Sequence, residues 1–143
     1  MIGRGNFLII INKIINGIQF DIEFKHKINY LETVNSSKGK SLLLKTIRSY
    51  CYDTELLRCE LINYENYKSC IGVIEHLIEL NDLLLLDNVE LYITNDIMYK
   101  LNQSDIIVIY ASCNHQMIRM ENSGYYDIVY TSTKVVVREN LNG

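Results

Sequence analysis

The stretch that most constrains the fold runs from residue 28 to residue 46 and reads INYLETVNSSKGKSLLLKT. It begins with apolar residues and passes through a short polar segment that contains one glycine. It then continues into leucines and an isoleucine at helical spacing. The stretch therefore predicts a strand from Ile28 to Val34, a polar loop, and a helix from Ser41 to about Tyr52.

The triad Gly39-Lys40-Ser41 at the end of this loop is typical of a phosphate-binding loop. In such a loop the lysine reaches the β- and γ-phosphates, the hydroxyl ligates Mg²⁺, and the first N–H groups of the helix bind phosphate oxygens. Ser41 is accordingly an expected metal ligand. The expected nucleotide-binding residues are Asn35, Ser36, Ser37, Lys38, Gly39, Lys40, Ser41 and Leu42.

One position departs from the pattern G-x-x-x-x-G-K-[ST], because Val34 stands where the first glycine is expected. A β-branched residue is stiff and poorly suited to a positive φ, so the loop is either reshaped or partly degraded. The alternative is that the triad is a chance tripeptide at a helix start, with Ser36 or Ser37 as an ordinary N-cap.

Composition predicts one globular domain over residues 1–143, since 48% of the residues are hydrophobic and 22% are charged. The net charge of −3 does not indicate a nucleic-acid-binding protein, and no apolar run reaches the roughly 18 residues of a membrane span. Four cysteines without a C-x-x-C pair, and no secretory signal, predict reduced thiols in a cytoplasmic protein. The lack of proline and tryptophan suggests an AT-rich source such as a low-GC bacterium or its phages.

Two hairpins are expected at the ends of the chain. Asn16-Gly17 lies between two apolar segments and is the strongest two-residue turn signal. Near the C-terminus, Thr131-Ser-Thr separates two further strand-like segments. Between the hairpins we expect a strand from Arg58 to Tyr64 and a helix from Tyr67 to Leu80.

The apolar run Leu83 to Asp87 ends in an acid, as a buried parallel strand with a functional residue at its carboxyl end would. It resembles a Walker B motif, in which the aspartate holds Mg²⁺ and a following glutamate polarises the attacking water. Here Asn88 follows Asp87, and an amide cannot take a proton. The expected catalytic residues are therefore Asn88, which can orient water, and Glu90, the nearest acid. The alternative is a plain buried strand with an acidic turn residue.

A helix from Tyr92 to Leu101 and a strand from Asp105 to Ser112 follow. P-loop ATPases carry a polar sensor of the γ-phosphate after such a strand, and the candidates here are Ser112, Asn114 and His115. A polar loop without that role is the alternative.

The order of these segments resembles a minimal P-loop ATPase of the AAA/ABC type with a degenerate Walker A loop. The resemblance implies an α/β fold of three layers, with a mainly parallel central sheet and hairpins at both ends. It also implies a sensor strand between the Walker A and Walker B strands, with ATP and Mg²⁺ bound at their carboxyl ends. The chain has no Leu-Ser-Gly-Gly signature and no room for a helical subdomain, so an ABC transporter subunit is not expected.

Two functions are consistent with the sequence. The first is a nucleotide-binding regulator or adaptor, at most a weak ATPase, whose bound state a protein partner reads. A second chain, such as a second copy in a homodimer, would supply an arginine finger from Arg48, Arg58 or Arg119. The second is a nucleotide-independent pseudo-ATPase that acts by contact as a small inhibitor or adaptor, such as an anti-CRISPR protein of a phage or mobile element.

Overall fold

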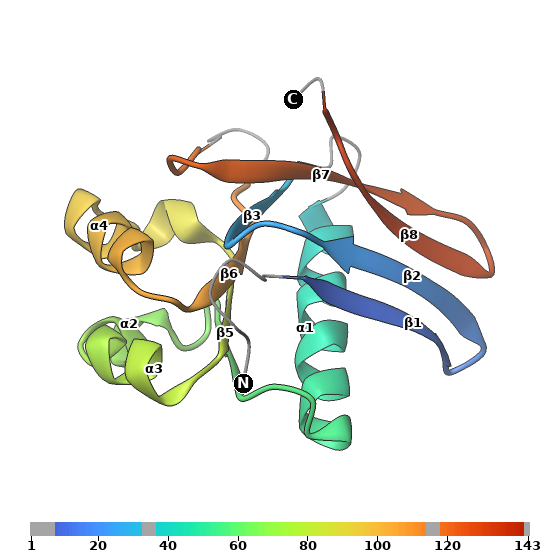
Figure 1. The fold of residues 1–143 in the computed structure, drawn as a ribbon, viewed down its shortest axis with the longest axis horizontal. Coiled ribbons are helices and arrows are strands. Elements are labelled where there is room, and N and C mark those ends of the chain that lie inside the picture. The colour runs from blue at the N-terminus through green and yellow to red at the C-terminus, as the bar shows by residue number, and fades with distance from the viewer. Residues whose placement is uncertain (1–7, 33–36, 114–117, 142–143) are drawn as a thin grey trace.

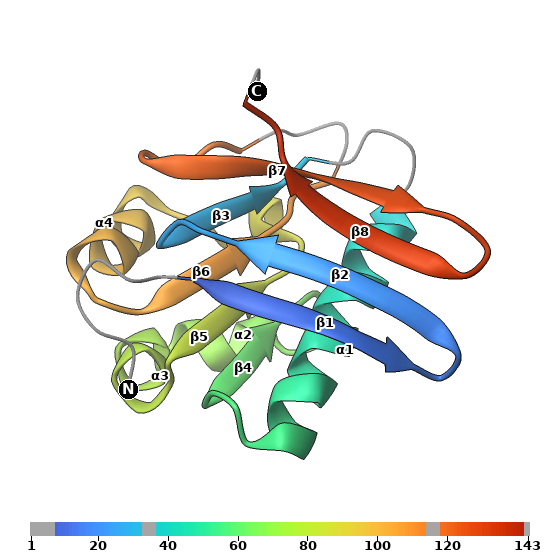
Figure 2. The ribbon, with the colours of Figure 1, turned by 45° about the vertical axis from the view of Figure 1, so that its right-hand side comes forward.

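The computed structural model describes residues 8–32, 37–113 and 118–141. All strands of the described residues belong to one eight-stranded sheet with the order β1-β2-β8-β7-β3-β6-β5-β4. Figures 1 and 2 show this sheet in two views, the second turned by 45° from the first. The strands are β1 Ile9–Ile15, β2 Ile18–Phe24, β3 Ile28–Leu31, β4 Cys59–Ile62, β5 Leu83–Leu86, β6 Ile107–Tyr110, β7 Ser123–Tyr130 and β8 Lys134–Glu139.

Two hairpins make up half of the sheet. β1 and β2 pair antiparallel around Asn16 and Gly17, which both have positive φ, at 51° and 79°. This is the turn that the dipeptide predicts. β7 and β8 also pair antiparallel, and β8 joins the two hairpins by pairing parallel to β2. The other half consists of β3, β6, β5 and β4, all parallel to their neighbours, and β7 pairs parallel to β3.

The sheet curls around the long helix α1, Ser37–Thr54. Leu43, Leu44 and Ile47 of α1 lie in one buried cluster that includes Ile11 of β1 at one end of the sheet and Leu61 of β4 at the other. Contacts from both ends of the sheet to one helix require a strongly curved, half-barrel shape. The apolar face of α1 therefore sits inside the curve.

Three shorter helices cover the opposite face of the parallel half (Figure 1). They are α2 Tyr67–Ile71, α3 Ile74–Leu80 and α4 Asn95–Gln103, with the short 3₁₀ helix η1 Val89–Leu91 before α4. Their apolar residues pack on a second buried cluster with the side chains of β3, β5 and β6 that face away from α1. Among the described residues, no helix is both long enough and apolar enough to cross a membrane.

The expected three-layer P-loop NTPase-like fold with a mainly parallel central sheet is wrong. The described chain forms one mixed, curled sheet, and among its residues the second helical layer covers only the parallel half. The P-loop pattern expects the hairpins to be additions to the ends of a parallel sheet. They instead pair with each other and with β3, so they are integral strands of a half-barrel.

Some predicted elements also differ in their limits. The helix expected from Tyr67 to Leu80 is interrupted after Ile71, where Gly72 and Val73 separate α2 from α3. The helix expected from Tyr92 begins only at Asn95, because the Thr94 side chain accepts a hydrogen bond from the Ile97 N–H and caps its start. β6 nevertheless lies between β3 and β5, which is the local order that the resemblance implied.

Candidate functional site

Several predicted residues meet where α1 begins and where β5 and β6 end. Parallel strands bring their carboxyl ends to the same edge of the sheet, so Asp87 and Ser112 become neighbours there. The Lys40 Nζ atom donates a hydrogen bond of 2.7 Å to the Ser112 carbonyl oxygen. The first turn of α1 is thereby fixed to the end of β6.

Lys40 is a buried cation, with 3% of its surface exposed. Burial lowers the pKa of its ammonium group, although the nearby carboxylates of Asp87 and Glu90 act in the opposite direction. A buried lysine is costly unless an anion or several acceptors compensate for its lost hydration. This edge of the sheet is therefore suited to receive negative charge.

Ser41 lies one residue further along α1 and contacts the acid at the end of β5. Its Oγ donates a hydrogen bond of 2.6 Å to Asp87 Oδ2, and the Asn88 N–H donates one of 2.9 Å to Asp87 Oδ1. Asp87 itself is 7% exposed, and burial raises its pKa. A hydroxyl and a carboxylate are hard oxygen donors that fit Mg²⁺, which typically takes its remaining ligands from phosphates and water. Ser41 and Asp87 are the residues that would hold this ion.

Asn88 adopts the left-handed conformation, with φ of 55°, between β5 and η1. Its Oδ1 atom is buried, and no group among the described residues donates a hydrogen bond to it. Glu90 lies in η1, and its carboxylate accepts a hydrogen bond of 3.0 Å from the Cys113 N–H. The oxygen of the predicted water-orienting amide is therefore out of contact with solvent, and the predicted acid is already engaged by the chain after β6.

Three tyrosines that the sequence did not indicate complete the surroundings. The Tyr30 hydroxyl lies 2.8 Å from Ser112 Oγ, and the Tyr92 hydroxyl donates a hydrogen bond of 2.7 Å to the Asp87 carbonyl. The Tyr130 hydroxyl donates to the Gly39 carbonyl, and a Cβ at Gly39 would come within 2.7 Å of that hydroxyl oxygen. Tyr92 is only five residues after Asp87, whereas Tyr130 is distant in the chain from Gly39, so no local pattern could have indicated its contact.

The remaining predicted residues are placed as follows. Ser37 and Lys38 form the first turn of α1, and the Leu42 side chain points outward with 63% of its surface exposed. Other predicted positions lie outside the described residues. These are Val34, Asn35, Ser36, Asn114 and His115.

The three candidate arginine fingers all form ion pairs within the chain. Arg48 pairs with Glu60 and Arg58 with Asp82, on the side of the molecule where α1 ends. Arg119 pairs with Glu32 at 2.7 Å, directly after β3, and its guanidinium lies 4.6 Å from the centre of the Tyr125 ring. Arg119 is thus nearest in the fold to the strand that leads into the predicted loop.

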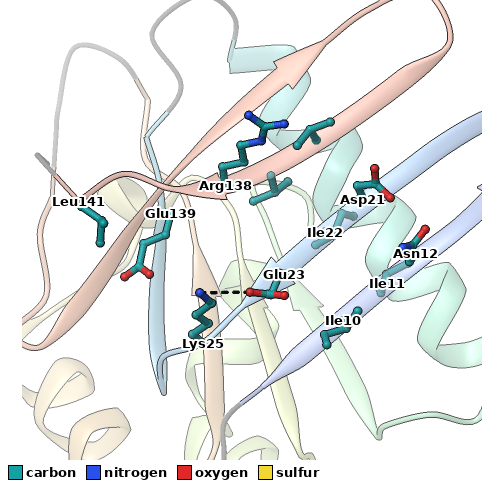
Figure 3. Close-up of a pocket in the computed structure, with 12 residues that line it drawn as sticks. Ile10, Ile11, Asn12, Asp21, Ile22, Glu23, Lys25, Arg138, Glu139 and Leu141 are labelled. Atoms are coloured by element: carbon teal, nitrogen blue, oxygen red, sulfur yellow. Dashed lines mark ion pairs between the residues drawn. The ribbon is translucent and has the colours of Figure 1, made fainter.

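A separate surface hollow lies on the outer face of β1, β2 and β8 (Figure 3). Its rim carries charged side chains, among them Glu23 and Lys25, whose carboxylate and ammonium groups lie 3.3 Å apart. None of the predicted site residues lines this hollow. It is therefore distinct from the cluster around Lys40.

Comparison of the chain with protein-family models, curated proteins and solved structures found no match. The geometry of the cluster around Lys40 is therefore the basis for the proposed function.

Proposed function

We propose that the protein binds ATP with Mg²⁺ at Gly39-Lys40-Ser41 and acts as an ATP-dependent regulator or adaptor. The observation that carries this proposal is the contact of 2.6 Å between Ser41 Oγ and Asp87 Oδ2, next to a buried lysine at the start of α1. These are one cationic group and two oxygen ligands at the positive end of an 18-residue helix.

Binding would exchange protein contacts for ligand contacts. Ser41 and Asp87 would hold Mg²⁺ through their side-chain oxygens in place of the hydrogen bond that they now form with each other. Lys40 would turn from the Ser112 carbonyl to a phosphate oxygen, with which its ammonium group would form a charge-assisted hydrogen bond. The first N–H groups of α1 would bind further phosphate oxygens.

Hydrolysis would be slow. Asn88 could orient water only once its buried Oδ1 became accessible. Its amide cannot accept a proton in any case. Glu90 could act as a base only after it released the Cys113 N–H. We therefore expect the protein to act through its nucleotide-bound state, which a protein partner would recognise, rather than through ATP hydrolysis.

Equilibrium binding of a fluorescent ATP analogue to the purified protein tests this proposal. We expect saturable binding that depends on Mg²⁺ and that Lys40→Ala abolishes. The matched control is Lys45→Ala, because Lys45 lies on the same helix with a side chain that is 55% exposed and only a distant ion pair to Glu65. Asp87→Ala should remove the Mg²⁺-dependent part of the affinity.

A specific observation favours the second candidate function, in which the protein acts by contact without nucleotide. Lys40, Ser41 and Glu90 each form a hydrogen bond within the chain, so the polar groups of the site have partners without a ligand. If no analogue binds at millimolar concentration with Mg²⁺, the nucleotide proposal fails. The inhibitor or adaptor function on this scaffold then becomes the working hypothesis.

A further inference from the structure

Two cysteines of adjacent elements lie together on the side of α1 far from the candidate site. Cys51 belongs to the last turns of α1, and Cys59 begins β4. Both cysteines line one surface hollow, and Cys59 packs against the buried cluster that contains Cys51. The nucleotide site uses neither of them.

The fold itself holds the two thiols in place. α1 packs on β4, and the chain reverses between them through Glu55, which has a positive φ of 53°. Asp82 then fixes the start of β4, because its carboxylate accepts hydrogen bonds from both the backbone N–H and the guanidinium of Arg58. The short connection therefore keeps the end of α1 beside the start of β4.

A small reagent can reach this pair from solvent through Cys59. Both cysteines line a surface hollow of about 740 Å³ between the end of α1 and the start of β4. Cys59 is partly exposed in it, whereas Cys51 is buried. The hollow admits a molecule of the size of water or hydrogen peroxide.

The electrostatic surroundings favour one thiolate in the pair. The hydrogen bond between the two thiols lowers the pKa of Cys51, whereas that hydrogen bond and burial raise the pKa of Cys59. Burial raises the pKa of Cys70 as well, so Cys51 is the cysteine of these three whose pKa is lowered. Thiolate character together with a neighbouring thiol is the arrangement that makes cysteine oxidation selective and reversible.

We propose that Cys51 and Cys59 form a redox modification site at which a peroxide converts the two thiols into a disulfide between α1 and β4. A thiolate sulfur of the pair attacks one oxygen of H₂O₂, and the O–O bond breaks to give a sulfenic acid and hydroxide, which the released proton converts to water. The second thiol then attacks the sulfenic sulfur and expels a second water. Two thiols and one H₂O₂ thus yield one disulfide and two waters, with sulfur oxidised and oxygen reduced.

Peptide mapping of the full-length protein tests this site directly. Trypsin cleavage after Arg48, Arg58 and Lys68 places Cys51 and Cys59 on separate peptides, residues 49–58 and 59–68. After treatment with equimolar H₂O₂ and alkylation of free thiols, we expect these two peptides to be joined by a disulfide in the monomer. Dithiothreitol should restore both as separate, alkylatable peptides, and the oxidised monomer should unfold at a temperature several degrees higher.

The matched controls use the other cysteines and the more exposed member of the pair. Cys59→Ser should abolish the cross-linked peptide while leaving the fold intact, since Cys59 is not fully buried. The double variant Cys70→Ser/Cys113→Ser should form the disulfide as the original protein does. Oxidation to sulfinic acid without a cross-link, disulfides only between two molecules, or cross-links that involve Cys70 or Cys113 to the same extent would each overturn the proposal.

Discussion

At the scale of single residues, the site keeps a charge that its surroundings disfavour. Burial raises the pKa of Asp87 even though Ser41 and the Asn88 N–H donate hydrogen bonds to its carboxylate. A group that stays buried and charged at a cost in stability is a common mark of a functional position. This cost leads to a measurable dependence on pH.

Asp87→Asn should make the unliganded protein at least as stable at neutral pH, because it removes the disfavoured charge and Ser41 Oγ can rotate to accept from the new amide. The native carboxyl has a raised pKa, so the folded state binds more protons than the unfolded state above the ordinary pKa of 3.8. The original protein therefore loses stability as pH rises through this window, and the variant does not. Thermal unfolding at intervals between pH 4 and pH 8 should show the difference in Tm between variant and original growing with pH. A difference that shrinks with pH would contradict the assignment.

At the scale of elements, the Asn16-Gly17 turn joins the two strands at the edge of the sheet. Gly17 has a φ of 79°, which an L-residue with a side chain adopts only at a cost. Gly17→Ala should therefore destabilise the protein by about 1–2 kcal/mol in urea unfolding. Gly72→Ala is the matched control, because Gly72 has a φ of −64° and no atom within 4 Å of an added Cβ. It should be neutral or stabilise by up to about 1 kcal/mol, and equal losses at both positions would contradict the turn assignment.

Elements could be predicted from the sequence much better than their arrangement. Leu83 to Leu86 and Ile107 to Tyr110 are continuous apolar runs, and a strand buried on both faces leaves that local signal. The pairing of β2 with β8 joins residues more than a hundred positions apart, and no local pattern encodes it. The half-barrel therefore could not be predicted.

The candidate site shows the same division. The sequence motifs predicted that Lys40, Ser41, Asp87 and Ser112 would act together, and the structure joins them in two hydrogen-bonded pairs, Lys40 with Ser112 and Ser41 with Asp87. The motifs did not predict that Glu90 would bind the Cys113 N–H or that Tyr130 would reach Gly39. Those contacts depend on how loops and the second hairpin pack. This packing joins residues much farther apart in the chain than a sequence motif extends.

At the scale of the whole molecule, α1 connects the two chemical features. Its first turn carries Lys40 and Ser41, and its last turns carry Cys51, beside β4. Strands from both edges of the curled sheet share one buried cluster with this helix. A ligand that fixes the start of α1 would therefore stabilise the entire core rather than one loop. A nucleotide at the site should therefore act on global stability.

The most direct test of nucleotide binding is thermal unfolding of the purified protein with and without ATP and Mg²⁺. A ligand that binds only the folded state adds about 2.7 kcal/mol of stability at a hundredfold excess over its dissociation constant. For a chain of this size that corresponds to a rise in Tm of roughly 5–10 °C. We predict such a rise with ATP and Mg²⁺ together, its loss in Lys40→Ala, and its retention in Lys45→Ala. No rise, or an equal rise in Lys40→Ala, would contradict nucleotide binding at the start of α1.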